Sequence, residues 1–556
     1  MHPRTSVRDT RHVAGGVDLF DPGFARRTVG DLLRGQAERS GDRPWVLFED
    51  DVLTFADVDR LVDASAAGLA GLGVSRGTPV AVMLPNSPRF LVLALALGRV
   101  GAVFVPVNLA LRGESLRHVL ARSQAELLVV DASLLDRAAP VVAELPCLRT
   151  VAVAGGDPPR GLKAHAVPVA EIETAAPAET VPASAAATTD PWCVMFTSGT
   201  TGPAKGAVMT HQYWYLVPST LAGPARDIRS DDVFYVSSPM FHAAAWLVQL
   251  FPSLMLGLPV AIDASFSAST FWDRVRRYGA TQLLTMGATH LWLWNQPPST
   301  SDADHPGRVW APVPLPSELR EPFRERFGIE HLWSTYGGTE FMSVTCTDVR
   351  TPWKAGTSGR ARPGVQLSVQ DADGRELPAG EVGELCVRPT LPHAIFHGYL
   401  GMPEETLRRF RDLWYHTGDL VHVDEDGDLT FVDRQDDYLR VRGENVSSFD
   451  VETAIARHPA VAEAAAFSVR STESALVAED EVMVAVVAAE DETVVPEDVL
   501  RLAAGDLPHY AVPRYLDVVA DLPRTETGRV QKHVLRARGV SGSTFDRVRA
   551  KMTIER

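Results

Sequence analysis

Cysteine is scarce in this 556-residue chain. The sequence has no Cys-x-x-Cys pair and no histidine cluster at ligand spacing, and its four cysteines are scattered at Cys147, Cys193, Cys346 and Cys386. Disulfide frameworks and structural zinc sites depend on paired or closely spaced cysteines. The pattern therefore argues against both.

Positive charge is also in short supply. The 54 lysines and arginines are outnumbered by 70 aspartates and glutamates, which gives a formal net charge of -16. Nucleic acids and anionic membranes bind to basic surfaces. We therefore expect no nucleic-acid partner and no membrane partner, while a local basic channel for a nucleotide remains compatible with this charge.

Long apolar runs are missing. The first residues carry basic side chains but no apolar core, so they do not resemble a secretory signal. The most apolar window, 91–111, is interrupted by Gly98, Arg99, Gly101 and Pro106. This pattern predicts a helix followed by a strand rather than a membrane span, and a cytoplasmic location.

An alternation of strand and helix patterns runs through the first half of the chain. The length predicts two or more domains. Strands are expected at 80–83, 102–105, 126–130, 192–196, 207–209, 233–236, 259–262 and 282–285, with helices at 88–100, 114–122 and 271–278. This alternation indicates an α/β fold with two subdomains of helix-covered parallel sheet.

The pattern of apolar and turn-forming residues changes after residue 345. Short apolar runs broken by turns indicate a β-rich subdomain up to 433, and a small α+β domain follows. We therefore expect a large N-terminal domain at 1–433 and a small C-terminal domain at 434–556. Within 424–428 the acidic run resembles part of a calcium loop, but Gln435 stands where that loop needs a bidentate glutamate, so a hairpin turn is expected.

The run TSGTTGPAKG at 197–206 follows an expected strand. Its glycines let backbone N–H groups converge on an anion, its hydroxyls add donors, and Lys205 adds positive charge. It is not a Walker A loop, because Gly206 stands where that motif has serine or threonine. The residues favour a polyphosphate ligand, with an ordinary surface loop as the alternative.

This run resembles the phosphate loop of the adenylate-forming superfamily, which includes acyl-CoA and aryl-CoA synthetases, adenylation domains of peptide synthetases, and luciferases. Three further segments follow in the family's order, at 336–340 (YGGTE), 415–420 (YHTGDL) and 433–437 (DRQDD). The segment 440–448 resembles the branch that contains crotonobetaine/carnitine-CoA ligase. Such enzymes join a carboxylate to the α-phosphate of ATP, release pyrophosphate and pass the acyl group to a thiol.

The resemblance assigns roles around the nucleotide. The phosphate contacts would be Thr197, Ser198, Gly199, Thr200, Thr201, Gly202 and Lys205. The adenine, ribose and phosphate contacts would be Tyr336, Gly338, Thr339, Asp419 and Arg434. Glu340 would hold Mg²⁺ together with Thr201, because a carboxylate supplies the hard oxygen that this ion prefers.

Other residues are assigned to the acid, the hinge and the acceptor. Gly337, His242, Trp246 and Trp310 would line the acid pocket. Core packing is the alternative for Trp310, and a structural role is the alternative for His242. Asp436 would be the hinge, and Gly443 and Glu444 would line the pantetheine tunnel after the small domain rotates.

The sequence departs from the family at the catalytic lysine, where it has Arg529. Arginine keeps the charge but is planar and bulkier than an ammonium group. Either Arg529 acts in an altered geometry, Lys532 reaches in, or adenylation is slow. In addition, tryptophan and prolines at 310–316 replace the small residues that usually line the pocket.

The resemblance implies an ATP- and Mg²⁺-dependent, AMP-forming ligase. It would transfer an organic acid, aromatic or unsaturated among the candidates, to coenzyme A. One alternative is an enzyme that uses ATP to activate nitrite and diazotises an aromatic amine. Another is a degenerate nucleotide-binding protein without activity, and the sequence leaves open whether the chain forms a homodimer.

Overall fold

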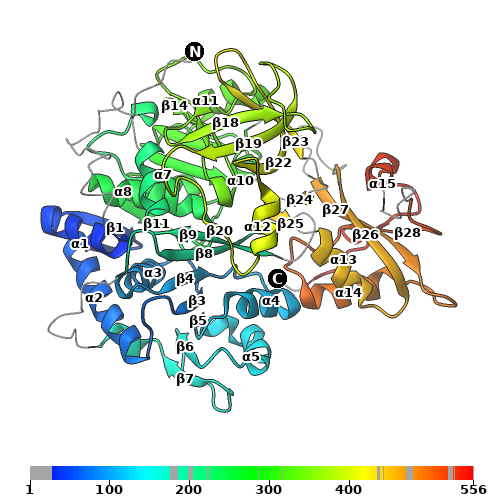
Figure 1. Cartoon of the computed structure of the whole chain (residues 1–556), viewed down its shortest axis with the longest axis horizontal. Helices are drawn as coiled ribbons and strands as arrows, with labels where there is room; N and C mark the ends of the chain where they lie inside the picture. Colours follow the sequence, from blue (N-terminus) through cyan, green and yellow to red (C-terminus); the bar gives the residue numbers. More distant parts are fainter. Residues whose placement is uncertain are drawn as a thin grey trace.

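The computed structural model describes a larger body and a smaller C-terminal body (Figure 1). It describes residues 28–175, 186–197, 204–221, 224–286, 289–315, 317–434, 439–441, 444–446, 448–470, 480–523, 530 and 532–554. Within these residues no helix combines the length and the apolar character that crossing a membrane requires.

The first α/β subdomain is built on an eight-stranded sheet in the order β20-β9-β8-β4-β3-β5-β6-β7. The strands are β3 (Pro79–Met83), β4 (Val103–Pro106), β5 (Leu127–Asp131), β6 (Thr150–Ala154), β7 (His165–Pro168), β8 (Pro191–Thr197), β9 (Lys205–Thr210) and β20 (Gly398–Tyr399). Its helices are α2 (Phe55–Gly71), α3 (Pro88–Val100), α4 (Gly113–Ser123), α5 (Leu135–Glu144) and α6 (Ala170–Glu173). Strands β3 to β7 pair in parallel, whereas β8 and β9 form an antiparallel hairpin.

Helix α3 shows how the local sequence sets these elements. The Ser87 hydroxyl accepts a hydrogen bond from the Phe90 N–H at 3.3 Å, and Pro88 occupies the first turn. Gly101 ends the helix in the left-handed region at φ 74°. The cap, the proline and the glycine are the signals that predicted this helix from the sequence.

The second α/β subdomain has a seven-stranded sheet in the order β14-β13-β12-β10-β11-β1-β2. The strands are β1 (Pro44–Phe48), β2 (Asp51–Thr54), β10 (Phe234–Val236), β11 (Val260–Ile262), β12 (Gln282–Met286), β13 (Val309–Val313) and β14 (His331–Leu332). The helices are α1 (Val29–Ser40), α7 (Tyr213–Leu221), a π-helix at Ala245–Leu250, α8 (Phe251–Leu256), α9 (Phe271–Tyr278), α10 (Thr289–Trp294) and α11 (Arg320–Phe327). All pairs in this sheet except β1 with β2 are parallel, as the alternation predicted.

The β-rich subdomain completes the larger body. One sheet contains β18 (Val365–Gln370), β19 (Gly383–Pro389), β21 (Phe410–Arg411), β22 (Trp414–Val423) and β23 (Leu429–Arg434), and a smaller one contains β15 (Thr335–Tyr336), β16 (Thr345–Cys346) and β17 (Arg360–Ala361). Asp424 begins the turn between β22 and β23, which confirms the hairpin. The Lys354 ammonium lies 2.8 Å from the Asp424 carboxylate and 3.3 Å from that of Asp428, so a lysine balances this acidic turn.

The smaller body has a four-stranded sheet and a hydrophobic core of its own. Its elements are β24 (Leu439–Val441), β25 (Glu444–Val446), α13 (Ser448–Ala456), β26 (Val461–Arg470), β27 (Asp480–Ala488), α14 (Pro496–Asp506), β28 (Tyr515–Val518), α15 (Lys532–Arg538) and β29 (Phe545–Asp546). All members of that core lie between residues 439 and 554. The α/β class, the large N-terminal body and the small C-terminal α+β body match the expectation.

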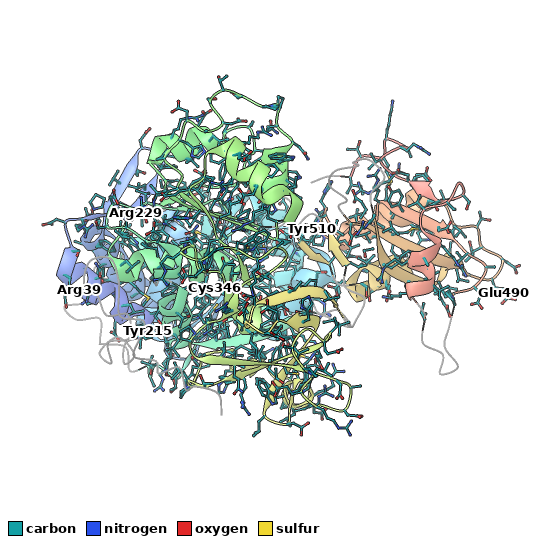
Figure 2. The ribbon with its side chains drawn as sticks, turned by 90° about the horizontal axis from the view of Figure 1, so that it is seen from above. Arg39, Tyr215, Arg229, Cys346, Glu490 and Tyr510 are labelled. Carbon is teal, nitrogen blue, oxygen red and sulfur yellow. The ribbon has the colours of Figure 1, made fainter. Side chains whose placement is uncertain are left out.

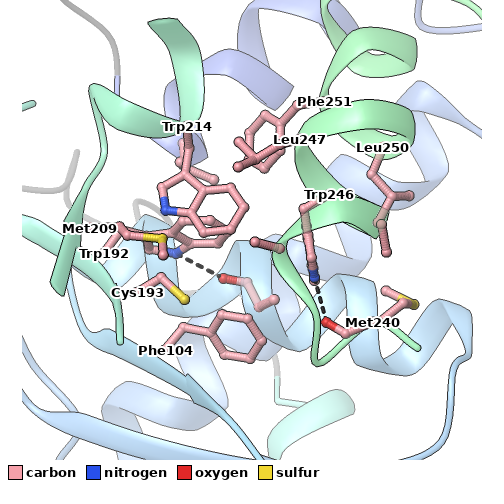
Figure 3. Packing of buried hydrophobic residues seen from close by; sticks show 14 of the residues in the cluster. Phe104, Trp192, Cys193, Met209, Trp214, Met240, Trp246, Leu247, Leu250 and Phe251 are labelled. Atoms are coloured by element: carbon pink, nitrogen blue, oxygen red, sulfur yellow. Dashed lines mark hydrogen bonds between the residues drawn. The ribbon is translucent and has the colours of Figure 1, made fainter. Parts of the chain in front are cut away.

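Aromatic side chains fill the core of the larger body (Figure 3). The Trp192 and Trp214 rings meet edge to face with centres 4.9 Å apart, and Trp246 packs against both. The Trp246 N–H donates to the Met240 carbonyl at 2.6 Å, and only 1% of the residue is exposed. The prediction that Trp246 lines the acid pocket is therefore corrected to a core role.

Trp310 needs the same correction. It is fully buried, its N–H donates to the Thr285 hydroxyl at 2.8 Å, and its ring centre lies 4.5 Å from that of Phe323. As a residue of β13, Trp310 packs against α11. It therefore belongs to the hydrophobic core between strand and helix and not to a pocket wall.

We expect Trp246→Phe to destabilise the protein by about 2 kcal/mol, because phenylalanine leaves a void and the buried Met240 carbonyl loses its donor. Denaturant unfolding measures this change. Trp292→Phe is the matched control, since Trp292 is 40% exposed and its replacement should cost less than about 0.5 kcal/mol. Equal stability of the two variants would contradict the core role.

Candidate active site

The loop end of the β8–β9 hairpin is the starting point of the site. Thr197 ends β8, Lys205 begins β9, and the Thr197 hydroxyl donates to the Lys205 carbonyl at 3.4 Å. The predicted phosphate contacts between them lie outside the described residues, namely Ser198, Gly199, Thr200, Thr201 and Gly202. The hairpin therefore sets the positions in space of both ends of the predicted phosphate loop.

Lys205 is buried and already has an anionic partner. Its ammonium donates to the Glu405 carboxylate on α12 (Pro403–Arg409) and lies 5.4 Å from the centre of the Tyr399 ring. Burial alone would raise the pKa of Glu405, but the hydrogen bonds and charges of Lys205 and Arg408 outweigh it and hold the pKa below its ordinary value. In this structure Lys205 anchors β9 to α12, and its phosphate contact stays a prediction.

The loop at 336–340 folds tightly because of its glycines. A Cβ on Gly337 would lie 2.3 Å from the Ser343 backbone nitrogen, and one on Gly338 would lie 3.0 Å from the Phe341 ring. Only a residue without a side chain fits the first position. The close packing sets Tyr336 and Glu340 at the two ends of one short loop, and Gly337 serves this packing.

At one end of the loop, Tyr336 meets Asp419. The Tyr336 hydroxyl donates to the Asp419 carboxylate, and the ring lies 5.9 Å from that of Phe431. Asp419 is only 2% exposed, and it pairs with Arg434 across the β22–β23 ladder. The structure thus brings together the aromatic ring and the carboxylate that were predicted to hold adenine and ribose, with the Arg434 backbone beside them.

At the other end of the loop, Glu340 faces the hairpin. Its Oε1 accepts a hydrogen bond from the Tyr399 hydroxyl at 2.9 Å and lies 3.4 Å from the Thr197 hydroxyl. Burial and the charge of Glu340 raise the pKa of Tyr399 far above its ordinary value, so this donor stays neutral. The result is a carboxylate surrounded by hydroxyl oxygens next to the predicted phosphate loop.

A cavity of about 230 Å³ lies between the two bodies. Thr197, Ala204 and Thr339 line one part of it, and residues of α4, of α13 and of the segment 506–511 line another. His242 and Glu444 both line it, with the His242 Nε2 3.5 Å from the Glu444 carboxylate. Residues assigned from sequence to the acid pocket and to the pantetheine tunnel therefore share one space.

Lys532 does not reach this cavity in the structure. Its ammonium lies 2.8 Å from the Ser448 hydroxyl and 2.6 Å from the Glu452 carboxylate, both on α13. This domain arrangement therefore does not support Lys532 as the replacement for the missing catalytic lysine. Arg529, Asp436 and Gly443 lie outside the described residues.

The sequence reasoning missed Tyr399 and Glu405, which contact Glu340 and Lys205. Both lie near residue 400, far along the chain from the motifs they touch. The only sequence signal was a tyrosine and a glutamate in a turn-rich segment. The contacts arise because β20 pairs with β9 and so returns to the first sheet.

We expect Gly337→Ala to destabilise the protein by about 2 kcal/mol, because the new methyl group would overlap the Ser343 backbone. Thermal and denaturant unfolding measure the loss. Gly71→Ala is the matched control, because a Cβ there meets no atom within 4 Å. If both alanines were equally well tolerated, the tight packing of the loop would be contradicted.

Comparisons with known proteins match nearly the whole chain. The family model of AMP-binding enzymes matches residues 33–400, and that of the AMP-binding enzyme C-terminal domain matches residues 450–529. A medium/long-chain-fatty-acid–CoA ligase of Mycobacterium tuberculosis is 32% identical over 531 residues, which cover 92% of this chain and 86% of the relative. A crotonobetaine/carnitine–CoA ligase of Escherichia coli is 30% identical over 486 residues, which cover 86% of this chain and 92% of the relative.

Solved structures share the fold. A double mutant of the o-succinylbenzoate CoA synthetase of Bacillus subtilis, bound with its product analogue, gives a TM-score of 0.80 at 22% identity, covering 94% of this chain and 99% of that one. The same synthetase in complex with AMP gives a TM-score of 0.65 at 22% identity, and the match covers 94% of this chain and 100% of that one. These likenesses show the fold, and the family matches show that the chain belongs to the family of AMP-binding enzymes.

Proposed function

We propose that this protein is an AMP-forming, ATP-dependent ligase that activates an organic carboxylic acid and transfers it to coenzyme A. The domain at 1–433 would bind the nucleotide and the acid, and the domain at 434–556 would complete the transfer site. The observation that carries the proposal is the loop at 336–340. It connects the Tyr336–Asp419 pair to Glu340 at the loop end of the β8–β9 hairpin.

The nucleotide would lie along this loop. Tyr336 offers an aromatic face for adenine, and the Asp419 carboxylate can accept hydrogen bonds from ribose hydroxyls, as it already does from a phenol. Arg434 sits beside Asp419 on the neighbouring strand. The polyphosphate would then extend toward Thr197 and the phosphate loop.

The oxygens near Glu340 fit a hard divalent cation, because a carboxylate and the Thr197 hydroxyl lie within 3.4 Å of each other. Glu340, with Thr201 of the neighbouring loop, would hold Mg²⁺. The ion would supply positive charge for the polyphosphate. Tyr399 keeps the carboxylate oriented toward the hairpin by its 2.9 Å hydrogen bond.

The first step would form a bond between a carboxylate oxygen and the α-phosphorus of ATP, while the bond from that phosphorus to the bridging oxygen breaks and pyrophosphate leaves. In the second step the thiol sulfur of coenzyme A would bond to the acyl carbon as AMP leaves and the thiol loses its proton. Lys205 and Arg529 would supply cationic groups for the first step. Alignment and charge neutralisation carry such chemistry.

The cavity between the bodies supports the second step. Its lining extends from Thr197 and Thr339 to residues of α4, of α13 and of the segment 506–511, and so it would connect the activated acid to an incoming thiol. The TM-score is 0.80 with the neighbouring synthetase bound with its product analogue and 0.65 with the same synthetase in complex with AMP. This difference supports assigning the arrangement to thiol transfer.

The cavity wall supports an aromatic or unsaturated acid. The Phe241 and His242 ring centres lie 4.7 Å apart, and both residues line the cavity together with Thr339. Flat rings on a pocket wall pack well against a flat substrate, because offset and edge-to-face contacts between aromatic groups are favourable. An acid conjugated to a ring or a double bond suits this surface.

The test is pyrophosphate release with Mg-ATP across a panel of aliphatic, unsaturated and aromatic acids, each with and without coenzyme A. We expect release that depends on the acid, together with an acyl-CoA mass. A separate arm contains nitrite and aromatic amines. Release that needs nitrite and ignores coenzyme A would overturn the ligase assignment in favour of diazotisation.

We expect Glu340→Gln to lower pyrophosphate release by about 100-fold or more, because the amide keeps the shape but loses the charge that would hold the metal. The melting temperature should stay close to that of the parent. Glu325→Gln, at an exposed position on α11, is the control and should retain full activity. Unchanged turnover in Glu340→Gln would contradict the metal assignment.

A further inference from the structure

The small body docks on the first turn of α4 through Asp506, the last residue of α14. A Cβ on Gly113 would lie 2.5 Å from the Asp506 carboxylate and 3.3 Å from its Cα. Gly113 also adopts φ +51°, which glycine tolerates best. The absence of a side chain at Gly113 is therefore what lets the two bodies approach this closely.

Charge complements this close approach. The first backbone N–H groups of a helix have no partner within the helix, and its N-terminus carries partial positive charge. The residue before α4, Arg112, provides no side-chain capping hydrogen bond. The Asp506 carboxylate lies next to this end of α4, and Arg457, the residue after α13, contacts its second oxygen at 2.5 Å.

A second contact lies nearby. The Asn108 side-chain amide donates to the Tyr510 hydroxyl at 3.1 Å, and its oxygen accepts from the Ala110 N–H at 2.9 Å. This local turn, which lies within the larger body, orients the Asn108 side chain independently of the small body. Figure 2 shows Tyr510 where the two bodies meet. In the same region the Ser115 hydroxyl donates to the Asp506 carbonyl at 3.4 Å.

These contacts frame the cavity assigned to thiol transfer. Asn108, Ser115, Asp506 and Tyr510 line it, whereas Gly113 stands just behind them. The contacts of Asp506 with Gly113 and Ser115, and that of Asn108 with Tyr510, join one body to the other, so a rotation of the small body would separate the partners. The contacts belong to this domain arrangement and would be absent from any arrangement in which α14 leaves α4.

We propose that Gly113 and Asp506, together with Asn108 and Tyr510, form a docking latch that holds the small domain in place for transfer to the thiol. Gly113 is then a positioning residue for the second step and takes no part in the first. The proposal rests on the two-step reaction proposed above. It goes further by naming the contact that selects the transfer arrangement.

The test compares the two half-reactions in Gly113→Ala. Acid-dependent exchange of pyrophosphate into ATP should stay within about twofold of the parent, while acyl-CoA formation should fall about tenfold or more, because the methyl group displaces Asp506. Gly279→Ala is the matched control, since Gly279 has φ +63° and an open surrounding with no atom within 4 Å of a Cβ. That control should keep both half-reactions.

A second variant separates steric from structural effects. Gly113→Ala combined with Asp506→Ala removes the overlapping carboxylate and should recover part of the acyl-CoA formation. Equal loss of both half-reactions in Gly113→Ala, or loss of neither, would overturn the latch. Failure of the proposed function is distinguishable, because the parent protein would then show no acid-dependent exchange.

Small-angle X-ray scattering gives a readout that does not depend on activity. We expect Gly113→Ala to change the scattering profile toward a looser arrangement of the two bodies, whereas Gly279→Ala should leave it unchanged. An identical profile for the parent and Gly113→Ala would count against the latch whatever the substrate is.

Discussion

Segments that lie far apart in the sequence contact one residue, Glu340, and two of them contact its carboxylate. Its side chain accepts a hydrogen bond from Tyr399 on β20 and approaches Thr197 on β8, and its backbone carbonyl accepts from the Phe396 N–H at 2.8 Å. Neutral hydroxyl donors orient the charge without cancelling it. A site prepared in this way can meet an incoming positive charge with little rearrangement, which is how electrostatic preorganisation assists catalysis.

Local sequence signals predicted most of the regular structure. The helix at 88–100 carried its own cap, proline and terminal glycine, and the strand–helix alternation gave the parallel sheets. The family assignment was confirmed because its motifs are short, contiguous and ordered. At the site, Tyr336 and Asp419 come from two of these motifs, and the structure brings them into contact although they lie 83 residues apart.

Contacts between distant segments could not be predicted in the same way. Residue type alone does not distinguish a tryptophan of a pocket from one of the core, and the hydrogen bonds of Trp246 and Trp310 decide for the core. The partner of Lys205 is 200 residues away, and nothing in the phosphate loop indicates Glu405. Tertiary packing, and not local preference, sets these positions.

The interface between the bodies suits the domain movement that the proposed two-step reaction requires. The small body has its own hydrophobic core, so it can move without exposing that core to water. The hydrogen bonds and charge contacts described at the α4 side are polar, and polar groups can exchange partners with water at low net cost. A broad apolar interface would fix one arrangement. In the proposed latch, Gly113 and Asp506 instead fit closely together, and the Asn108 and Tyr510 side chains form a directional hydrogen bond. These contacts favour one domain arrangement and leave the other accessible.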